Sequence, residues 1–331
     1  MILYKRMVLF FTIFILSFFI NQINWFYFIT YDGLDNPTYV VMLESGAYDS
    51  KPYYTILDYF KNEWLWSKIL TQLEFFFSAK FIFFDLFPFL NLFFIIYLIL
   101  KKTNFYYIFW VTFPYFILFW GAQLRSAFAV SLFYCLLFLF NALDKSKYFI
   151  IIFFGLLLSL IHTSILFFSL ITVVVVFISN FKKMNALLST ISFLLIGVFT
   201  ALITGPYLGK LLENLDDRRQ EIYSTNLTMG VDFKSSFFWG GVLILLILGV
   251  LKNRDKEIDF AYGVSLIFIS SLVITPFIGG GYAYRYLMMI FPFVIIAISN
   301  QRKYIRILLL SIMMIAYVYL FFVQLNFIRL F

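Results

Sequence analysis

Charged residues, cysteine and histidine are all scarce in this 331-residue chain. Only 13% of its residues are charged, whereas soluble domains carry roughly a quarter. The single cysteine, Cys135, lies inside an apolar run, which excludes disulfides and cysteine-based metal sites. The single histidine, His162, excludes a multi-histidine metal cluster. We therefore expect neither a metal nor another cofactor.

Familiar chemical motifs are missing as well. The sequence has no glycine-rich phosphate loop, no serine nucleophile elbow and no nucleic-acid-binding motif. Lys5 and Arg6 precede a long apolar run that no small-residue cleavage site follows, which indicates an uncleaved first helix. We expect no nucleic acid among the partners.

Apolar residues are abundant instead: 63% of the chain is hydrophobic and 23% is aromatic. The apolar runs are continuous and often about twenty residues long, which favours membrane helices over the alternating strands of a β-barrel. The sequence therefore predicts an all-α, polytopic integral membrane protein, surrounded by membrane lipid, with residues 1–331 as a single transmembrane domain. We expect about 11 transmembrane helices, at 7–29, 81–100, 104–120, 124–141, 148–162, 164–180, 186–204, 236–251, 260–278, 284–300 and 305–325.

Lysine and arginine are unevenly distributed across this topology. One side carries 14 of the 25 basic residues and four acidic ones, and the other carries 11 basic and 13 acidic residues. The positive-inside rule makes the first side cytoplasmic. Two longer polar segments, 30–80 and 205–235, are then extracytoplasmic, and so is the C-terminus.

Both extracytoplasmic segments are predicted to form amphipathic helices at the membrane surface. The segment 30–80 is acidic and contains Trp64, Trp66 and the phenylalanines at 75–77, which suit helices in the interface. In the second segment, apolar residues recur at helical spacing over 208–222, opposite charged ones.

Three cations lie at predicted outer ends of spans. Arg125 follows the third span, His162 closes the fifth and Arg285 opens the tenth, and none has an acidic residue beside it in the sequence. Arg218 and Arg219 belong to the second extracytoplasmic segment on the same side. Cations gathered at one membrane face suit a lipid-linked phosphate or diphosphate, because the arginine side chain offers a planar fork of donors and stays charged.

Each of these cations also has a purely structural interpretation. Arg125 and Arg285 can extend to lipid headgroups. His162 can be a hydrogen-bonded residue at a helix end. Arg218 and Arg219 can pair with acidic neighbours on a solvated helix face.

Several short motifs, taken in order, resemble the EpsG/Wzy-type polymerases of bacterial surface polysaccharides. An early tyrosine-rich outer segment contains Asp35 and Tyr39. It is followed by Arg-Ser-Ala at 125–127, His-Thr-Ser at 162–164 and Arg-Tyr at 285–286 ahead of a proline.

The resemblance implies a glycosyltransferase with a multi-span GT-C-like architecture in the bacterial cytoplasmic membrane, with its active site facing the periplasm or exterior. Such an enzyme joins oligosaccharide repeat units carried on undecaprenyl diphosphate, and a chain-length regulator protein is a further partner that the sequence leaves open. The leaving diphosphate needs fixed cations and the attacking hydroxyl needs a base. The candidates are His162, or Asp35 in its place, as the catalytic base; Arg125, Arg285, Arg218 and Arg219 for diphosphate binding; and Tyr39, Tyr284 and Tyr286 for substrate binding.

Two other functions compete with this interpretation. A flippase for lipid-linked oligosaccharide also needs cations within the membrane, but the inner halves of the predicted spans contain almost no charge, which favours a one-sided site. A lipid-head acyltransferase is disfavoured because no Asp or Glu neighbours His162 in the sequence.

Overall fold

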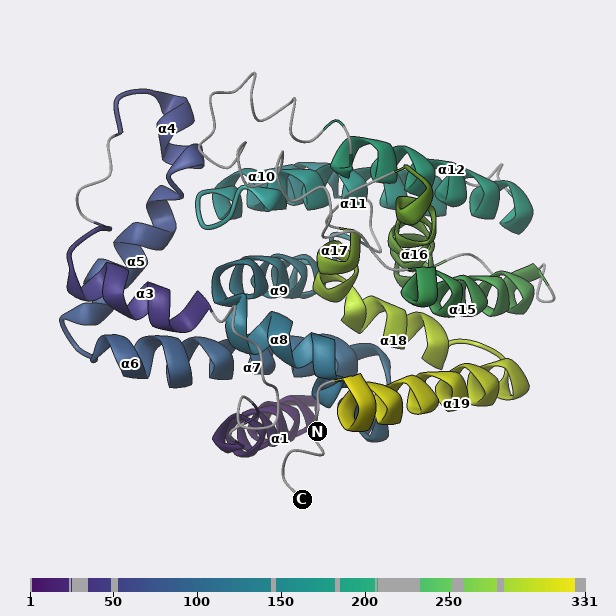
Figure 1. Cartoon of the computed structure of the whole chain (residues 1–331), viewed down its shortest axis with the longest axis horizontal. Coiled ribbons are helices and arrows are strands. Elements are labelled where there is room, and N and C mark those ends of the chain that lie inside the picture. Colours follow the sequence, from purple (N-terminus) through teal and green to yellow (C-terminus); the bar gives the residue numbers. More distant parts are fainter. Residues whose placement is uncertain are drawn as a thin grey trace. The chain divides into compact units, whose positions relative to one another are not determined.

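The computed structural model describes residues 2–23, 25, 35–48, 53–143, 147–181, 185–205, 207, 233–251, 259–278 and 283–324. Every secondary-structure element in these ranges is helical, as the sequence predicts (Figure 1). The predicted amphipathic helix over 208–222 lies outside the described residues. The chain divides into two compact units, one formed by Met1–Leu170 with Ile315–Phe331 and the other by Ile171–Met314.

The first unit is built around the helix α7 (Phe87–Lys102), which packs against α1, α8 and α9 (Figure 1). The side chains at Leu92, Ile95, Ile96 and Ile99 are buried, and their spacing places them on one helix face. The helices of this unit are α1 (Ile2–Gln22), α3 (Asp35–Glu44), α4 (Ile56–Lys61), α5 (Trp64–Glu74), α6 (Ala79–Phe81), the π-helix η1 (Ile82–Leu86), α7, the 3-10 helix η2 (Phe105–Thr112), α8 (Pro114–Ala122), α9 (Leu124–Leu139) and α10 (Tyr148–Ser159). The helix α11 (Ser164–Asn180) begins in this unit, and α19 (Lys303–Tyr319) with the π-helix η3 (Leu320–Gln324) ends in it.

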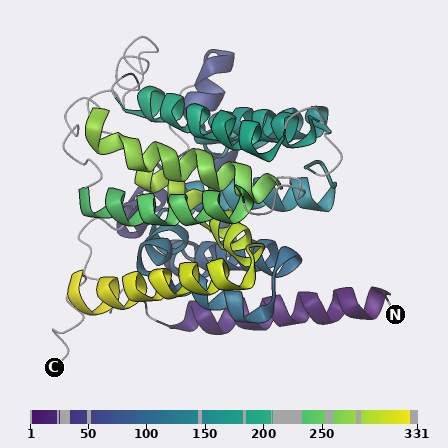
Figure 2. The same cartoon turned by 90° about the vertical axis from the view of Figure 1, so that its right-hand side faces the viewer.

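The second unit is built around α16 (Phe260–Ile278). This helix contacts α12 (Ala186–Thr204), α15 (Phe233–Leu251), α17 (Ala283–Met289) and α18 (Phe291–Ser299), and Figure 2 shows α12, α15 and α16 side by side. A Cβ added at Gly197 would lie 2.5 Å from the carbonyl oxygen of Ile267, so the close approach of α12 and α16 requires glycine there.

Among the described residues, five helices are long and apolar enough to cross a membrane: 79–102, 186–204, 233–251, 260–278 and 303–322. A sixth span results if η2 and α8, which are bent by 79° at Phe113, are counted as one. Four further apolar stretches within the described ranges are 10–17 residues long, short of the roughly twenty that a span needs: Met7–Gln22 of α1, Leu124–Leu139, Tyr148–Ser159 and Ser164–Asn180. The predicted count of eleven spans is therefore not confirmed.

The predicted single helix over 284–300 is wrong. The chain there forms α17 and α18, which are separated at Ile290, because Pro292 lies in the first turn of α18 and has no N–H to extend the preceding helix.

Trp66 packs inside the protein and does not face outward. Its side chain is fully buried, with ring centroids 4.6 Å from Phe87 and 6.4 Å from Phe128. Phe75 and Phe76, at the end of α5, do remain exposed. The helix α5 is thus attached to the membrane helices by one face and presents apolar rings at its C-terminal end.

Candidate functional site

The start of α5 is anchored on the end of α10. The backbone N–H groups of Leu65 and Trp66 both donate to the carbonyl oxygen of Leu160, at 3.0 and 3.4 Å. Glu63 precedes them with a backbone φ of 53°, in the left-handed region that costs a non-glycine residue roughly 1–2 kcal/mol. Its side chain makes no capping bond to α5, so the carboxylate is directed elsewhere.

Arg125 is the second residue of α9, directly after the break that separates α8 from α9. Two buried asparagines satisfy carbonyl groups around this break. Asn91 Nδ2 donates to the carbonyl oxygen of Trp120 at 2.9 Å, and Asn36 Nδ2 donates to that of Gly121 at 2.9 Å. Because unsatisfied buried carbonyls cost about 1–3 kcal/mol each, these side chains hold the break, and with it Arg125, in one conformation.

His162 lies in the tight turn between α10 and α11. The two helices approach closely below this turn, because a Cβ at Gly155 would lie 2.6 Å from the Cβ of Ser169. The hydroxyl of Ser169 also donates to the carbonyl oxygen of Ile151 at 3.3 Å. The helical hairpin therefore gives the histidine a defined position.

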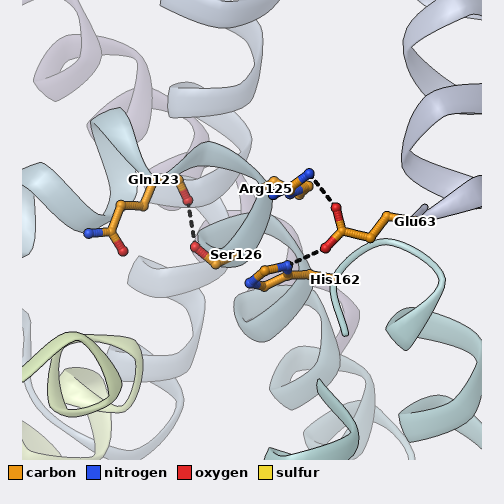
Figure 3. A network of polar contacts seen from close by, with 5 residues as sticks. All are labelled: Glu63, Gln123, Arg125, Ser126 and His162. Carbon is orange, nitrogen blue, oxygen red and sulfur yellow. Dashed lines mark hydrogen bonds and ion pairs between the residues drawn. The ribbon is translucent and has the colours of Figure 1, made fainter. Parts of the chain in front are cut away.

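Glu63 joins these three parts of the first unit (Figure 3). Its Oε1 lies 2.7 Å from His162 Nδ1, and its Oε2 forms an ion pair with Arg125 Nη1. The carboxylate is almost completely buried, at 3% exposure, whereas the Arg125 side chain is 21% exposed. We call Glu63, Arg125 and His162 the carboxylate cluster.

Arg125 and His162 have no acidic residue beside them in the sequence, and their acidic partner is the distant Glu63. A lone carboxylate buried to this degree would be costly to keep ionised, and the arginine offsets that cost. Removing one partner of such a buried pair typically costs about 3–5 kcal/mol.

The contact with Glu63 also determines the chemistry of the imidazole. An ionised carboxylate only accepts hydrogen bonds, so Nδ1 of His162 carries the hydrogen and donates a hydrogen bond to Glu63 Oε1. In the neutral ring, Nε2 then holds the lone pair that can take up a proton. This arrangement suits a base whose orientation is set by a carboxylate.

Aromatic residues surround the arginine side of the carboxylate cluster. The guanidinium carbon of Arg125 lies 6.0 Å from the centroid of the Tyr39 ring, within the range of a cation–π contact. Burial raises the pKa of Tyr48, which also interacts electrostatically with Tyr39 and Arg125. Tyr48 therefore remains a neutral hydroxyl in this environment.

The other predicted site residues have different locations. Asp35 begins α3, and its side chain lies outside the part of the chain that the structure describes. Tyr284, Arg285 and Tyr286 lie on α17 of the second unit. Arg218 and Arg219 lie outside the described residues.

Arg285 has a buried side-chain nitrogen. Its Nε–H donates no hydrogen bond within the described residues. Within the same ranges, no three His, Cys, Asp or Glu side chains form a group that could hold a metal ion.

Glu63 is a site residue that the sequence motifs do not contain. A signal was present, because an arginine and a histidine at the ends of apolar runs require a counter-charge, and Glu63 is an acid followed by apolar Trp64 and Leu65. Comparison with known proteins gives no match to any protein-family model, to any curated protein or to any solved structure.

Proposed function

We propose that this chain is a polysaccharide polymerase of the EpsG/Wzy type, with a GT-C-like architecture. It is a glycosyltransferase that joins undecaprenyl-diphosphate-linked oligosaccharide repeat units at the outer face of the cytoplasmic membrane. The observation that supports this proposal most is the carboxylate cluster, in which Arg125 and His162 converge on Glu63. The sequence motifs single out these two residues for complementary roles in one reaction.

Arg125 serves the donor substrate. Loss of a polyprenyl diphosphate develops negative charge, which a fixed cation stabilises in the transition state. The Arg125 side chain is partly exposed although one of its nitrogens pairs with Glu63, so substrate can reach the guanidinium. Tyr39 provides an aromatic face beside it on which a sugar ring can pack.

The proposal also keeps the roles that the sequence motifs give to other residues. Arg285, whose buried Nε donates no hydrogen bond within the described residues, binds diphosphate. Arg218 and Arg219 add positive charge from the second extracytoplasmic segment, and Tyr284 and Tyr286 contact the glycan.

His162 serves the acceptor substrate. The lone pair on Nε2 takes the proton of the attacking sugar hydroxyl, while Nδ1 donates to Glu63. A properly positioned base contributes about 10²–10⁴-fold in rate.

A flippase for lipid-linked oligosaccharide is the second candidate. The buried Glu63–His162 contact favours it as well, because carboxylate–histidine chains within membranes often relay protons in transporters.

Replacement of Arg125 tests the enzyme directly. The purified protein in liposomes, supplied with undecaprenyl-diphosphate-linked repeat units, should produce a ladder of polymer on a gel. Arg125→Ala should abolish the ladder, and Arg125→Lys should do nearly the same because lysine lacks the planar fork. Lys68→Ala, at an exposed position on α5, is the control. A normal ladder from Arg125→Ala would refute the proposed donor site.

Replacement of His162 in cells separates the polymerase from the flippase. A polymerase with His162→Ala should still permit transfer of single repeat units to the cell surface, without long chains. If single-unit product disappears as well while the protein is made normally, transport becomes the better explanation.

A further inference from the structure

We propose that Glu63 is a positioning residue, which holds His162 in the tautomer and orientation that make Nε2 the acceptor of the substrate proton. This inference rests on the proposed glycosyltransferase function and adds to it a residue that the sequence motifs do not contain. The two oxygens of Glu63 have separate tasks, since Oε1 contacts His162 Nδ1 at 2.7 Å and Oε2 pairs with Arg125.

Glu63 is suited to this task because its own position is closely determined. Its left-handed backbone conformation is one of two among non-glycine residues in the described ranges, and such strain persists only where the surroundings enforce it. Shortly after Glu63, the backbone N–H groups of Leu65 and Trp66 donate to the carbonyl oxygen of Leu160. Leu160 lies two residues before His162. The carboxylate and the imidazole are therefore held against the same short piece of backbone.

In the proposed glycosyl transfer, one bond forms at the anomeric carbon of the donor sugar and one bond breaks. The acceptor hydroxyl gives its proton to His162 Nε2 as its oxygen forms a bond to the anomeric carbon of the donor sugar. The bond from that carbon to the diphosphate oxygen breaks, and the electron pair leaves with the polyprenyl diphosphate. Glu63 stabilises the resulting imidazolium through Nδ1–H, and Nε2 then releases its proton to water.

Donor binding at Arg125 distinguishes a positioning role of Glu63 from a merely structural one. Loss of the Glu63 charge removes a competing anion from Arg125, so binding of the anionic donor should not weaken. A positioning role therefore predicts a lower kcat without a higher KM for the donor. A residue with a merely structural role would disturb kcat and KM together.

The experiment is a double-mutant cycle in liposomes with undecaprenyl-diphosphate-linked repeat units as substrate. We expect Glu63→Gln to lower kcat by at least about 10-fold, since loss of a carboxylate that orients a catalytic histidine has effects of this size or larger. In a His162→Gln background, Glu63→Gln should cause no further loss, because the carboxylate then has no base to position. Glu74→Gln, the same change at the exposed end of α5, is the matched control.

Glu63→Asp keeps the inference testable if Glu63→Gln does not fold. It retains the charge but shortens the side chain, so kcat should fall less than with Gln, again only when His162 is present. The positioning role would be overturned if the Glu63 change lowered kcat by the same factor with His162 and with His162→Gln. A raised KM for the donor with unchanged kcat would overturn it too. If the wild-type protein polymerises and the cycle is additive, only this inference fails, whereas absence of polymer from the wild type contradicts the glycosyltransferase itself.

Discussion

The close contact between α10 and α11 makes Gly155 a sensitive test of how the hairpin positions His162. An alanine at 155 would place its Cβ 2.2 Å from Ser169 Oγ and 2.6 Å from Ser169 Cβ. Carbon atoms in contact are normally about 3.5–4.0 Å apart, so the two helices must separate by roughly 1 Å.

This displacement has two expected consequences. Overpacking of this kind costs about 1–3 kcal/mol, which should lower the melting temperature. The turn that carries His162 also moves, and a misplacement of about 1 Å at a catalytic group can reduce the rate by about 10²-fold. We therefore expect Gly155→Ala to impair polymer formation more than its stability alone explains.

The measurement combines thermal unfolding in detergent with the rate of polymer formation in liposomes. Gly241→Ala is the matched control, because nothing lies within 4 Å of a Cβ at that position on α15. A second change, Ser169→Gly in the Gly155→Ala protein, removes the clashing atoms and should recover activity. An unchanged melting temperature and rate in Gly155→Ala would refute the reasoning.

Three further predictions concern the supports of the site and the topology. Asn91→Ala should destabilise the protein by about 1–3 kcal/mol in unfolding measurements, because it leaves carbonyls at the α8–α9 break without a donor; an unchanged melting temperature would contradict this role. Hydrogen bonds from Thr55 hold the pKa of Asp58 below its ordinary value of 3.8, so this carboxylate stabilises the start of α4 at all pH values above 3.8 and that support is lost as pH falls through the lower folded value. The protection factor of the Thr55 amide, the unstructured exchange rate divided by its observed rate at the same pH, should therefore fall in acid, and Asp58→Asn should remove this pH dependence. In a cysteine-free background, a cysteine at Glu44 should react with a membrane-impermeant thiol reagent in whole cells and one at Lys182 should not; the reverse pattern would invert the topology.

Much of the helical structure was predictable from the sequence. The bounds expected for 186–204 and 260–278 are those of α12 and α16, because an apolar run in a bilayer can satisfy its backbone only by forming a helix. The same rule does not reveal where a run is interrupted. Pro114 and Pro292 are visible in the sequence, but only the structure shows a sharp bend before the first and a separation into two helices before the second.

The candidate site was predictable only in part. Arg125 and His162 stand out because an isolated cation between apolar runs is costly and needs a reason. The counter-charge does not stand out, since Glu63 is one of several acids in the segment 30–80 and lies 99 residues before His162.

The sequence by itself determined that this is an all-helical chain with several helices suited to a bilayer, because hydrophobic run length and backbone hydrogen bonding are local properties. It also determined which cations needed an explanation. Only the tertiary structure decided which acid provides the counter-charge, since that choice depends on the docking of α5 against Leu160 and on the turns that carry Arg125 and His162. Glu63 is buried beside Arg125 and His162 and is the shared partner of these two residues, because charges removed from water must be paired with one another.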